Sequence, residues 1–282
     1  MSLRVLRVLP GPRPRALAAV AALAALPVLA ACGTAATPST PAGTVAGGSP
    51  ASATSSAHLT GTVNILAAAS LQETFTTLKQ QFEAAHPGVT VTPNFGASSA
   101  LAQSIIQGSP ADVFASASQT NMDQVVQAGA ASTSKPFAKN VMAIAVPPGN
   151  PAGVAALADL AKPGVKVALC QAQVPCGSVA AKVFANAKIA VTPVSQEADV
   201  KSVLTKVQLG EVDAGVVYVT DVKAAGTKVK GVEIPADLNA STSYPIATLT
   251  KAPNPDAAAA FTAYVLSAEG RSVLAAGGFA AP

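Results

Sequence analysis

The sequence has few of the side chains that build metal centres and catalytic bases: no tryptophan, two histidines and three cysteines among 282 residues. His58 lies beside a stretch of small and polar residues, and His86 precedes Pro87 and Gly88 at an expected helix end. A zinc site therefore lacks its usual His and Cys ligands. A serine hydrolase also needs a positioned base, and neither histidine has an evident partner. The sequence predicts neither an enzyme nor a resident metal or cofactor.

The first 31 residues have the features of a bacterial export signal. Its basic residues are Arg4, Arg7, Arg13 and Arg15. The apolar run from Ala16 to Ala31 is short for a membrane span and is broken by Pro27, which favours a cleaved signal. Leu29-Ala30-Ala31-Cys32 resembles the lipobox of bacterial lipoproteins. We therefore expect residues 1–31 to be a lipoprotein signal peptide and Cys32 to be lipidated; a buried structural cysteine is the alternative. The protein would then be exported and lipid-anchored on the extracytoplasmic face of the cell membrane.

Excess charge is also absent from the expected mature chain. The whole sequence has 18 Lys and Arg against 14 Asp and Glu, but four of the arginines belong to the signal. The remaining chain is formally neutral and has no basic excess of the kind that binds nucleic acid. We expect no nucleic-acid partner.

Residues 32–58 lack the large apolar side chains that a folded segment needs. They are almost entirely Ala, Gly, Pro, Ser and Thr, a composition too poor in apolar surface to form a core. We expect a flexible tether here, following the lipidated cysteine. The residues after it are numerous enough for a large core or two small lobes.

Two cysteines remain after lipidation of Cys32. Cys170 and Cys176 are separated by Gln-Ala-Gln-Val-Pro, a loop that a disulfide can close. Because an exported protein meets an oxidising environment, we expect these two cysteines to be bonded to each other. Two free thiols are the alternative.

Short apolar strands alternate with amphipathic helices along the expected domain. The first helix shows the pattern clearly, because Leu71, Phe75, Leu78 and Phe82 fall on one stripe. Strands are predicted at 63–67, 89–95, 113–115, 141–146, 165–169 and 214–218, and further helices from Ser98 and near 119–128, 177–187 and 200–209. Such alternation predicts an α/β protein with mostly parallel sheets and helices on both faces.

Two of the expected strands pass into helices that begin near a serine. Ser70 and Glu73 have the spacing of a capping box, so a helix cap is one interpretation of Ser70. Ser98 follows Gly96 and Ala97 in the same way. Small residues before each serine leave backbone amides uncovered, and amides and hydroxyls at a helix start can bind an anion.

Two later turns add backbone donors and a phenol. Cys176 lies at the expected start of one helix, and Asp199 is expected to cap another, so that the first-turn amide of Val200 has no partner within the helix. Tyr218 ends an apolar strand, where a half-buried tyrosine with a hydrated hydroxyl is the simpler interpretation. In open α/β sheets, ligands bind where strands pass into helices.

Several segments resemble the molybdate-binding proteins of bacterial ABC importers, and the resemblance covers residues 61–279. They are Ala-Ala-Ala-Ser-Leu at 67–71, Phe-x-x-Ser-Ser-x-Leu at 95–101, Gly-Ser-Pro-Ala-Asp-Val-Phe at 108–114, Val-Pro-Cys-Gly at 174–177, Ala-Asp-Val at 198–200, Gly-Val-Val-Tyr at 215–218 and Tyr-Pro-Ile-Ala at 244–247. Each segment is weak alone, and together they are specific.

The resemblance implies both a fold and a binding site. The fold is the two-lobed periplasmic-binding-protein fold of type II, with a mostly parallel sheet flanked by helices in each lobe. Lobe one would comprise residues 59–142 and 247–282, and lobe two residues 143–246. In this family the oxyanion lies between the lobes, which implies binding by the following groups: the hydroxyls of Ser70, Ser98 and Tyr218 and the backbone amides of Cys176 and Val200.

The implied function is the capture of molybdate, and of tungstate, by a monomeric carrier that delivers the anion to an ABC permease. Molybdenum would be present only as bound molybdate at those residues. Carriers of other ions are the alternatives. Asp199 or Asp221 could accept the proton of a phosphate ion, and sulfate is a further tetrahedral candidate. A ferric-ion carrier would need clustered phenolates, for which the sequence has only Tyr218, Tyr244 and Tyr264.

Overall fold

The computed structural model describes residues 58–282. The expected signal peptide, Cys32 and nearly all of the expected tether lie outside the described residues. No helix between residues 58 and 282 is both long enough and apolar enough to cross a membrane.

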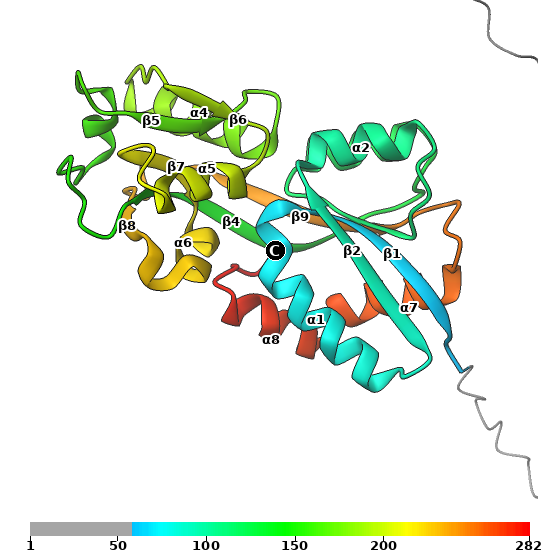
Figure 1. Ribbon diagram of the computed structural model, residues 1–282. Coiled ribbons are helices and arrows are strands. Elements are labelled where there is room, and N and C mark those ends of the chain that lie inside the picture. Colours follow the sequence, from blue (N-terminus) through cyan, green and yellow to red (C-terminus); the bar gives the residue numbers. More distant parts are fainter. Residues whose placement is uncertain (1–57) are drawn as a thin grey trace, which may run out of the picture. The chain divides into compact units, whose positions relative to one another are not determined.

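The strands form one path in the order β2-β1-β3-β9-β4-β7-β5-β6, and β8 also pairs with β4 (Figure 1). Their bounds are β1 Gly61–Ala68, β2 Val89–Gly96, β3 Val113–Ala115, β4 Lys135–Val146, β5 Val167–Cys170, β6 Ser195–Glu197, β7 Ala214–Tyr218, β8 Lys230–Glu233 and β9 Ser241–Thr248. β1, β2 and β3 run parallel, as do β5, β6 and β7. The long strand β4 is antiparallel to β7, β8 and β9.

β4 divides this path into two sheets. Its first part, up to Val141, pairs with β9, and from Met142 onward it pairs with β7. We call β2-β1-β3-β9 with the first part of β4 the first sheet, and β8, β7, β5 and β6 with the second part of β4 the second sheet. The α/β architecture is therefore confirmed, with parallel outer strands joined through antiparallel strands at the centre.

Helices cover both faces of the first sheet. Their bounds are α1 Gln72–Ala85, α2 Ser98–Ile106, α3 Gln119–Gln127, α7 Pro255–Val265 and α8 Ala268–Ala276. Ile65 and Ala67 of β1 point into a core with α1, α7 and α8, whereas Leu66 points to the opposite core with α2 and α3. This alternation follows from the two-residue period of a strand. Figure 1 shows α1, α7 and α8 on one side of the sheet and α2 on the other.

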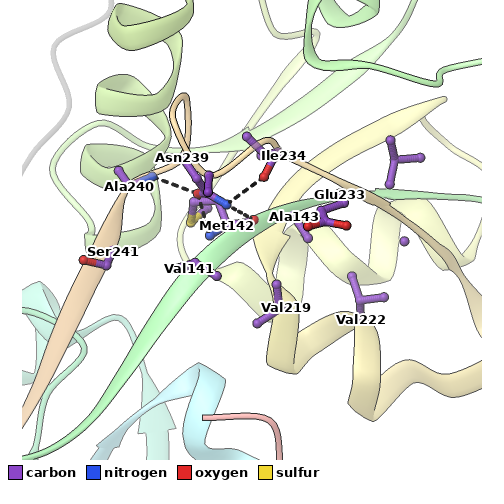
Figure 2. A pocket seen from close by; sticks show the side chains of 13 residues that line it. Val141, Met142, Ala143, Val219, Val222, Glu233, Ile234, Asn239, Ala240 and Ser241 are labelled. Carbon is purple, nitrogen blue, oxygen red and sulfur yellow. Dashed lines mark hydrogen bonds between the residues drawn. The ribbon is translucent and has the colours of Figure 1, made fainter. Parts of the chain in front are cut away.

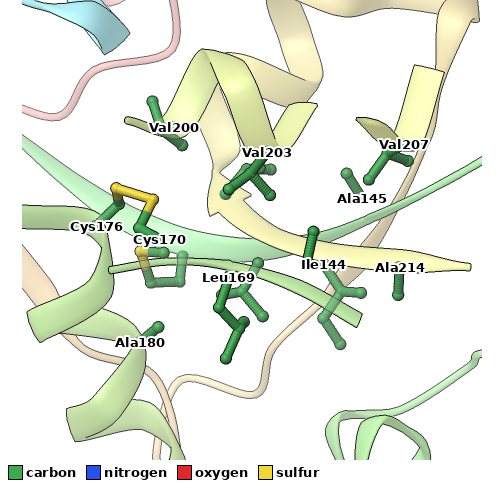
Figure 3. Packing of buried hydrophobic residues seen from close by; sticks show 14 of the residues in the cluster. Ile144, Ala145, Leu169, Cys170, Cys176, Ala180, Val200, Val203, Val207 and Ala214 are labelled. Carbon is green, nitrogen blue, oxygen red and sulfur yellow. A yellow bond between two sulfur atoms is a disulfide. The ribbon is translucent and has the colours of Figure 1, made fainter. Parts of the chain in front are cut away.

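The second sheet has its own core. Its helices are α4 Pro175–Ala187, α5 Val200–Gln208 and α6 Val219–Ala225, and short 3₁₀ turns occupy Ala69–Leu71, Leu157–Ala161 and Gly226–Lys228. Val200, Val203 and Val207 share one face of α5 and pack on the strands, with Ala180 of α4 on the other side (Figure 3). The two sheets thus have separate hydrophobic clusters. The lobe boundaries at residues 142–143 and 246–247 stay predictions.

Local patterns predicted several elements well and missed others. Phe75, Leu78 and Phe82 are buried on α1, and β3 and β7 have the predicted bounds. β4 begins at Lys135, six residues before the predicted start at Val141. The strands β6, β8 and β9 and the helices α6, α7 and α8 were not predicted as elements.

Candidate functional site

The carboxyl ends of parallel strands from both sheets meet around one small cavity of about 20 Å³. In the first sheet the neighbouring residues follow β1, β2 and β3; in the second they follow β5, β6 and β7. The lining residues are Ala68, Ala69, Ser70, Gly96, Ala97, Ser98, Ala117, Val174, Pro175, Cys176, Asp199, Val200 and Tyr218. The structure therefore brings together all five residues that the sequence analysis assigned to oxyanion binding. Their role as ligands stays a prediction at this point.

Ser70 and Ser98 do not cap their helices as the sequence spacing indicated. Ser70 lies in a 3₁₀ turn, and its Oγ is 2.8 Å from the Oη of Tyr244. Glu73 does not complete a capping box, because its carboxylate is paired with Lys201. Ser98 is the first residue of α2, and its Oγ accepts a 2.9 Å hydrogen bond from the backbone N–H of Ala117. Both hydroxyls are held by distant segments, so local sequence could not reveal their partners.

Cys176 and Val200 occupy first turns of helices, where backbone N–H groups have no acceptor within the helix. Cys176 follows Pro175 at the start of α4, and Val200 begins α5 after its N-cap residue, Asp199. The predicted cap is confirmed, since Asp199 Oδ1 accepts from the N–H of Ser202 at 3.0 Å. Both helix starts therefore direct partial positive charge at the cavity.

The predicted disulfide between Cys170 and Cys176 is present, with the two Cα atoms 5.8 Å apart. It joins the end of β5 to the first turn of α4 (Figure 3). Gly177 makes the same turn possible, because a Cβ at this position would lie 2.0 Å from the carbonyl oxygen of Gln171. The disulfide and this close backbone approach fix the position of the Cys176 amide.

Tyr218 ends β7 with its side chain fully enclosed. Its ring packs against that of Tyr244, with the two ring centroids 6.2 Å apart. Its Oη has no hydrogen-bond partner among residues 58–282. Burial raises the pKa of Tyr218 well above its ordinary value, so the phenol keeps its proton. A buried hydroxyl without a partner is costly. Its place in the cavity lining makes it an available donor for a bound ligand.

Lys201, which the sequence analysis did not single out, connects elements on the two sides of the cavity. Its Nζ lies 2.8 Å from Glu73 Oε2 on α1 and 3.1 Å from Asp221 Oδ1 on α6. Burial alone would lower the pKa of Lys201, but the two carboxylates outweigh that effect and hold the pKa above its ordinary value. Asp221 is fully buried and also accepts from the N–H of Tyr218 at 3.0 Å. Spacing along the chain gives no signal for this ion-pair group.

A larger hollow of about 590 Å³ lies elsewhere on β4 and contains none of the predicted site residues (Figure 2). Its lining is mostly apolar and comes from β4, α6, β8, the segment between β8 and β9, and the first residue of β9. Asn239 holds this region together, because its side chain accepts from the N–H of Met142 at 3.1 Å and donates to the carbonyl of Met142 at 2.9 Å. These bonds hold Met142 at the point where β4 passes from pairing with β9 to pairing with β7.

Comparisons with known proteins identify the family of this chain. The family model described as bacterial extracellular solute-binding protein matches residues 63–280. The molybdate-binding protein ModA of Mycobacterium tuberculosis is 43% identical over 245 residues, which cover 86% of this chain and 94% of that protein.

Solved structures of binding proteins share the fold. The periplasmic molybdate-binding protein of Azotobacter vinelandii has a TM-score of 0.68 at 18% identity, covering 78% of this chain and 99% of that chain. The sulfate-binding protein SubI of Mycobacterium tuberculosis has a TM-score of 0.68 at 20% identity, covering 77% of this chain and 86% of that chain. These structures confirm the two-lobed fold of type II, and the family match confirms the expectation of a binding protein instead of an enzyme. This chain belongs to the family of bacterial extracellular solute-binding proteins that includes the molybdate-binding proteins.

Proposed function

We propose that this protein is the substrate-binding protein of an ABC importer and that it binds molybdate, and tungstate, in the small cavity between the two sheets. The observation that carries the proposal is the donor set of that cavity. Hydroxyls of Ser70, Ser98 and Tyr218 and first-turn amides of Cys176 and Val200 surround one small space. Such a space suits a small inorganic anion and excludes a sugar or peptide.

The charge of the lining favours a dianion held by neutral groups. Asp199 is its one charged residue, and both carboxylate oxygens of Asp199 already accept from Ser202. Helix-start amides and hydroxyls stabilise negative charge while avoiding an unpaired buried cation. Size can then distinguish these anions, because the metal–oxygen bonds of molybdate and tungstate are longer than the S–O and P–O bonds of sulfate and phosphate. A rigid cage fitted to the larger ions contacts the smaller ones poorly.

The other carriers find less support in this cavity. Tyr218 is the one tyrosine that lines the cavity. The phenol of Tyr264 lies outside the cavity lining and donates a 2.7 Å hydrogen bond to Gln81. The described lining therefore lacks the clustered phenolates that ferric ion needs. Asp221 does not line the cavity and is already paired with Lys201. A phosphate carrier would need an acceptor for the phosphate proton.

Calorimetric titration of the purified, anion-free protein tests the proposal. Molybdate and tungstate are expected to bind at least about tenfold more tightly than sulfate and phosphate, a difference of about 1.4 kcal/mol. Equal or tighter binding of sulfate or phosphate would identify the protein as a carrier of that smaller anion.

We also propose that the protein is exported and anchored through lipid on Cys32. The support is the lipobox-like Leu29-Ala30-Ala31-Cys32 and the apolar segment before it. Cys32→Ser is expected to abolish acylation and to leave an unprocessed or mislocalised precursor, which membrane fractionation and mass spectrometry detect. An acylated product identical to the parent's would show that the anchor assignment is wrong.

A further inference from the structure

A chain of buried polar side chains lies behind Ser70. Tyr244 of β9 contacts Ser70 on one side, with 2.8 Å between the two hydroxyl oxygens. On its other side, the Tyr244 Oη lies 3.4 Å from Nδ2 of Asn140, which belongs to β4. Tyr244 and Asn140 are buried and, unlike Ser70, do not line the cavity. This hydrogen-bonded series therefore connects β4 and β9, the strands that join the two sheets, with Ser70, one predicted donor of the oxyanion site.

The neighbouring hydrogen-bond partners indicate the direction of this hydrogen-bonded series, beginning at Asn140. Asn140 Oδ1 accepts from the N–H of Val141 at 3.0 Å, so its NH₂ group faces the other way. That NH₂ group donates to Thr220 Oγ1 at 2.8 Å and to Tyr244 Oη at 3.4 Å. Burial raises the pKa of Tyr244 well above its ordinary value, so the phenol keeps one proton. Having accepted from Asn140, the phenol has that proton free to give to Ser70.

The consequence falls on the hydroxyl of Ser70. A serine hydroxyl has one proton, and an oxygen that accepts from Tyr244 is left with that proton for another partner. The cavity is where Ser70 can donate it. Ser98 is in the same position, because its Oγ already accepts from the N–H of Ala117. In this direction both serines would be oriented as donors before any anion arrives.

We propose that Tyr244, acting with Asn140, is a positioning residue that aims the Ser70 proton into the cavity and so makes the site selective for oxyanions that carry no proton. The inference rests on the proposed function and names a selectivity determinant of that site. Hydrogen phosphate must donate a proton as well as accept, and a serine committed to donating repels that proton. Molybdate and sulfate carry no proton at neutral pH and meet no such obstacle.

A double-mutant cycle between Tyr244→Phe and Ser70→Ala tests the positioning role. Phenylalanine keeps the ring that packs against Phe137 and Phe279, with centroids 6.2 and 5.2 Å away. Tyr244→Phe alone is expected to raise the molybdate Kd about 3- to 10-fold, since one oriented hydrogen bond is lost. In the Ser70→Ala background the same change is expected to have no further effect, because the residue through which Tyr244 acts is gone. Tyr264→Phe, which removes a phenol at the surface, is the matched control and should leave the Kd unchanged.

The ratios of Kd values for different anions distinguish a positioning role of Tyr244 from a merely structural one, because a structural role would leave these ratios unchanged. In Tyr244→Phe, Ser70 is free to turn and accept the proton of hydrogen phosphate, so the ratio of phosphate Kd to molybdate Kd should fall about 3- to 10-fold. The ratio of sulfate Kd to molybdate Kd should stay constant, because both anions lose the same oriented donor. An additive cycle, or a phosphate ratio that stays at the parent value, would overturn the inference while leaving the proposed function intact. A parent protein that binds none of these anions would overturn both.

Discussion

Replacing Lys201 with methionine is expected to destabilise the fold by about 3–5 kcal/mol, because the change leaves Asp221 buried without its cation. Methionine keeps most of the side-chain volume, so the loss reports charge more than packing. Thermal or urea unfolding of the anion-free protein measures it. The contact between Lys201 and Glu73 contributes little of this, since Glu73 is half exposed.

The pH dependence and a second substitution identify the cause. Burial already raises the pKa of Asp221 above its ordinary value, and loss of Lys201 raises it further. A carboxyl whose folded-state pKa is raised binds its proton more tightly in the folded state, so the deficit of Lys201→Met should shrink as pH falls toward the ordinary pKa of aspartate. Adding Asp221→Asn should recover most of the loss at neutral pH. A double variant as unstable as Lys201→Met would mean that packing, and not the buried charge, explains the effect.

Replacing Ser70 or Ser98 with alanine is expected to weaken molybdate binding by about 1.5–3 kcal/mol, roughly 10- to 150-fold, because each change removes a hydrogen bond to a charged ligand. Tyr218→Phe is expected to weaken binding too. Calorimetric Kd values measure the loss. The ligand-induced gain in stability, which follows RT ln(1 + [L]/Kd), should shrink in parallel at matched molybdate concentration. Parent values of both quantities in all three variants would place the binding site elsewhere.

The unliganded variants should differ from one another in stability. Ser98→Ala also leaves the buried N–H of Ala117 without its acceptor and should cost about 1–3 kcal/mol. Tyr218→Phe removes a buried hydroxyl that has no partner, so the unliganded melting temperature should be unchanged or slightly higher. Ser99→Ala is the matched control for Ser98→Ala, because Ser99 is the next residue of α2 and does not line the cavity. It should change neither affinity nor stability appreciably.

Local sequence signals were reliable where an element depends on its own residues. The apolar stripe of α1, the cap at Asp199 and the strand ending at Tyr218 were all predicted from short windows. β9 is different, because its segment alternates weakly and contains Pro245, yet it pairs with both β3 and β4. Its strand conformation comes from two distant partners. The same is true of the start of β4, whose first residues pair with that strand.

The sequence by itself determined which residues carry hydroxyls, amides and the two bonded cysteines at the strand-to-helix turns, because turn and cap chemistry is written in a few neighbouring residues. The tertiary structure alone decided that these turns meet at one cavity and which partner each group has. Ser70 contacts Tyr244 across 174 positions of sequence, and Lys201 reaches Glu73 across 128. Such pairs arise when β4 and β9 bring the two sheets together. Residue spacing along the chain does not predict that packing.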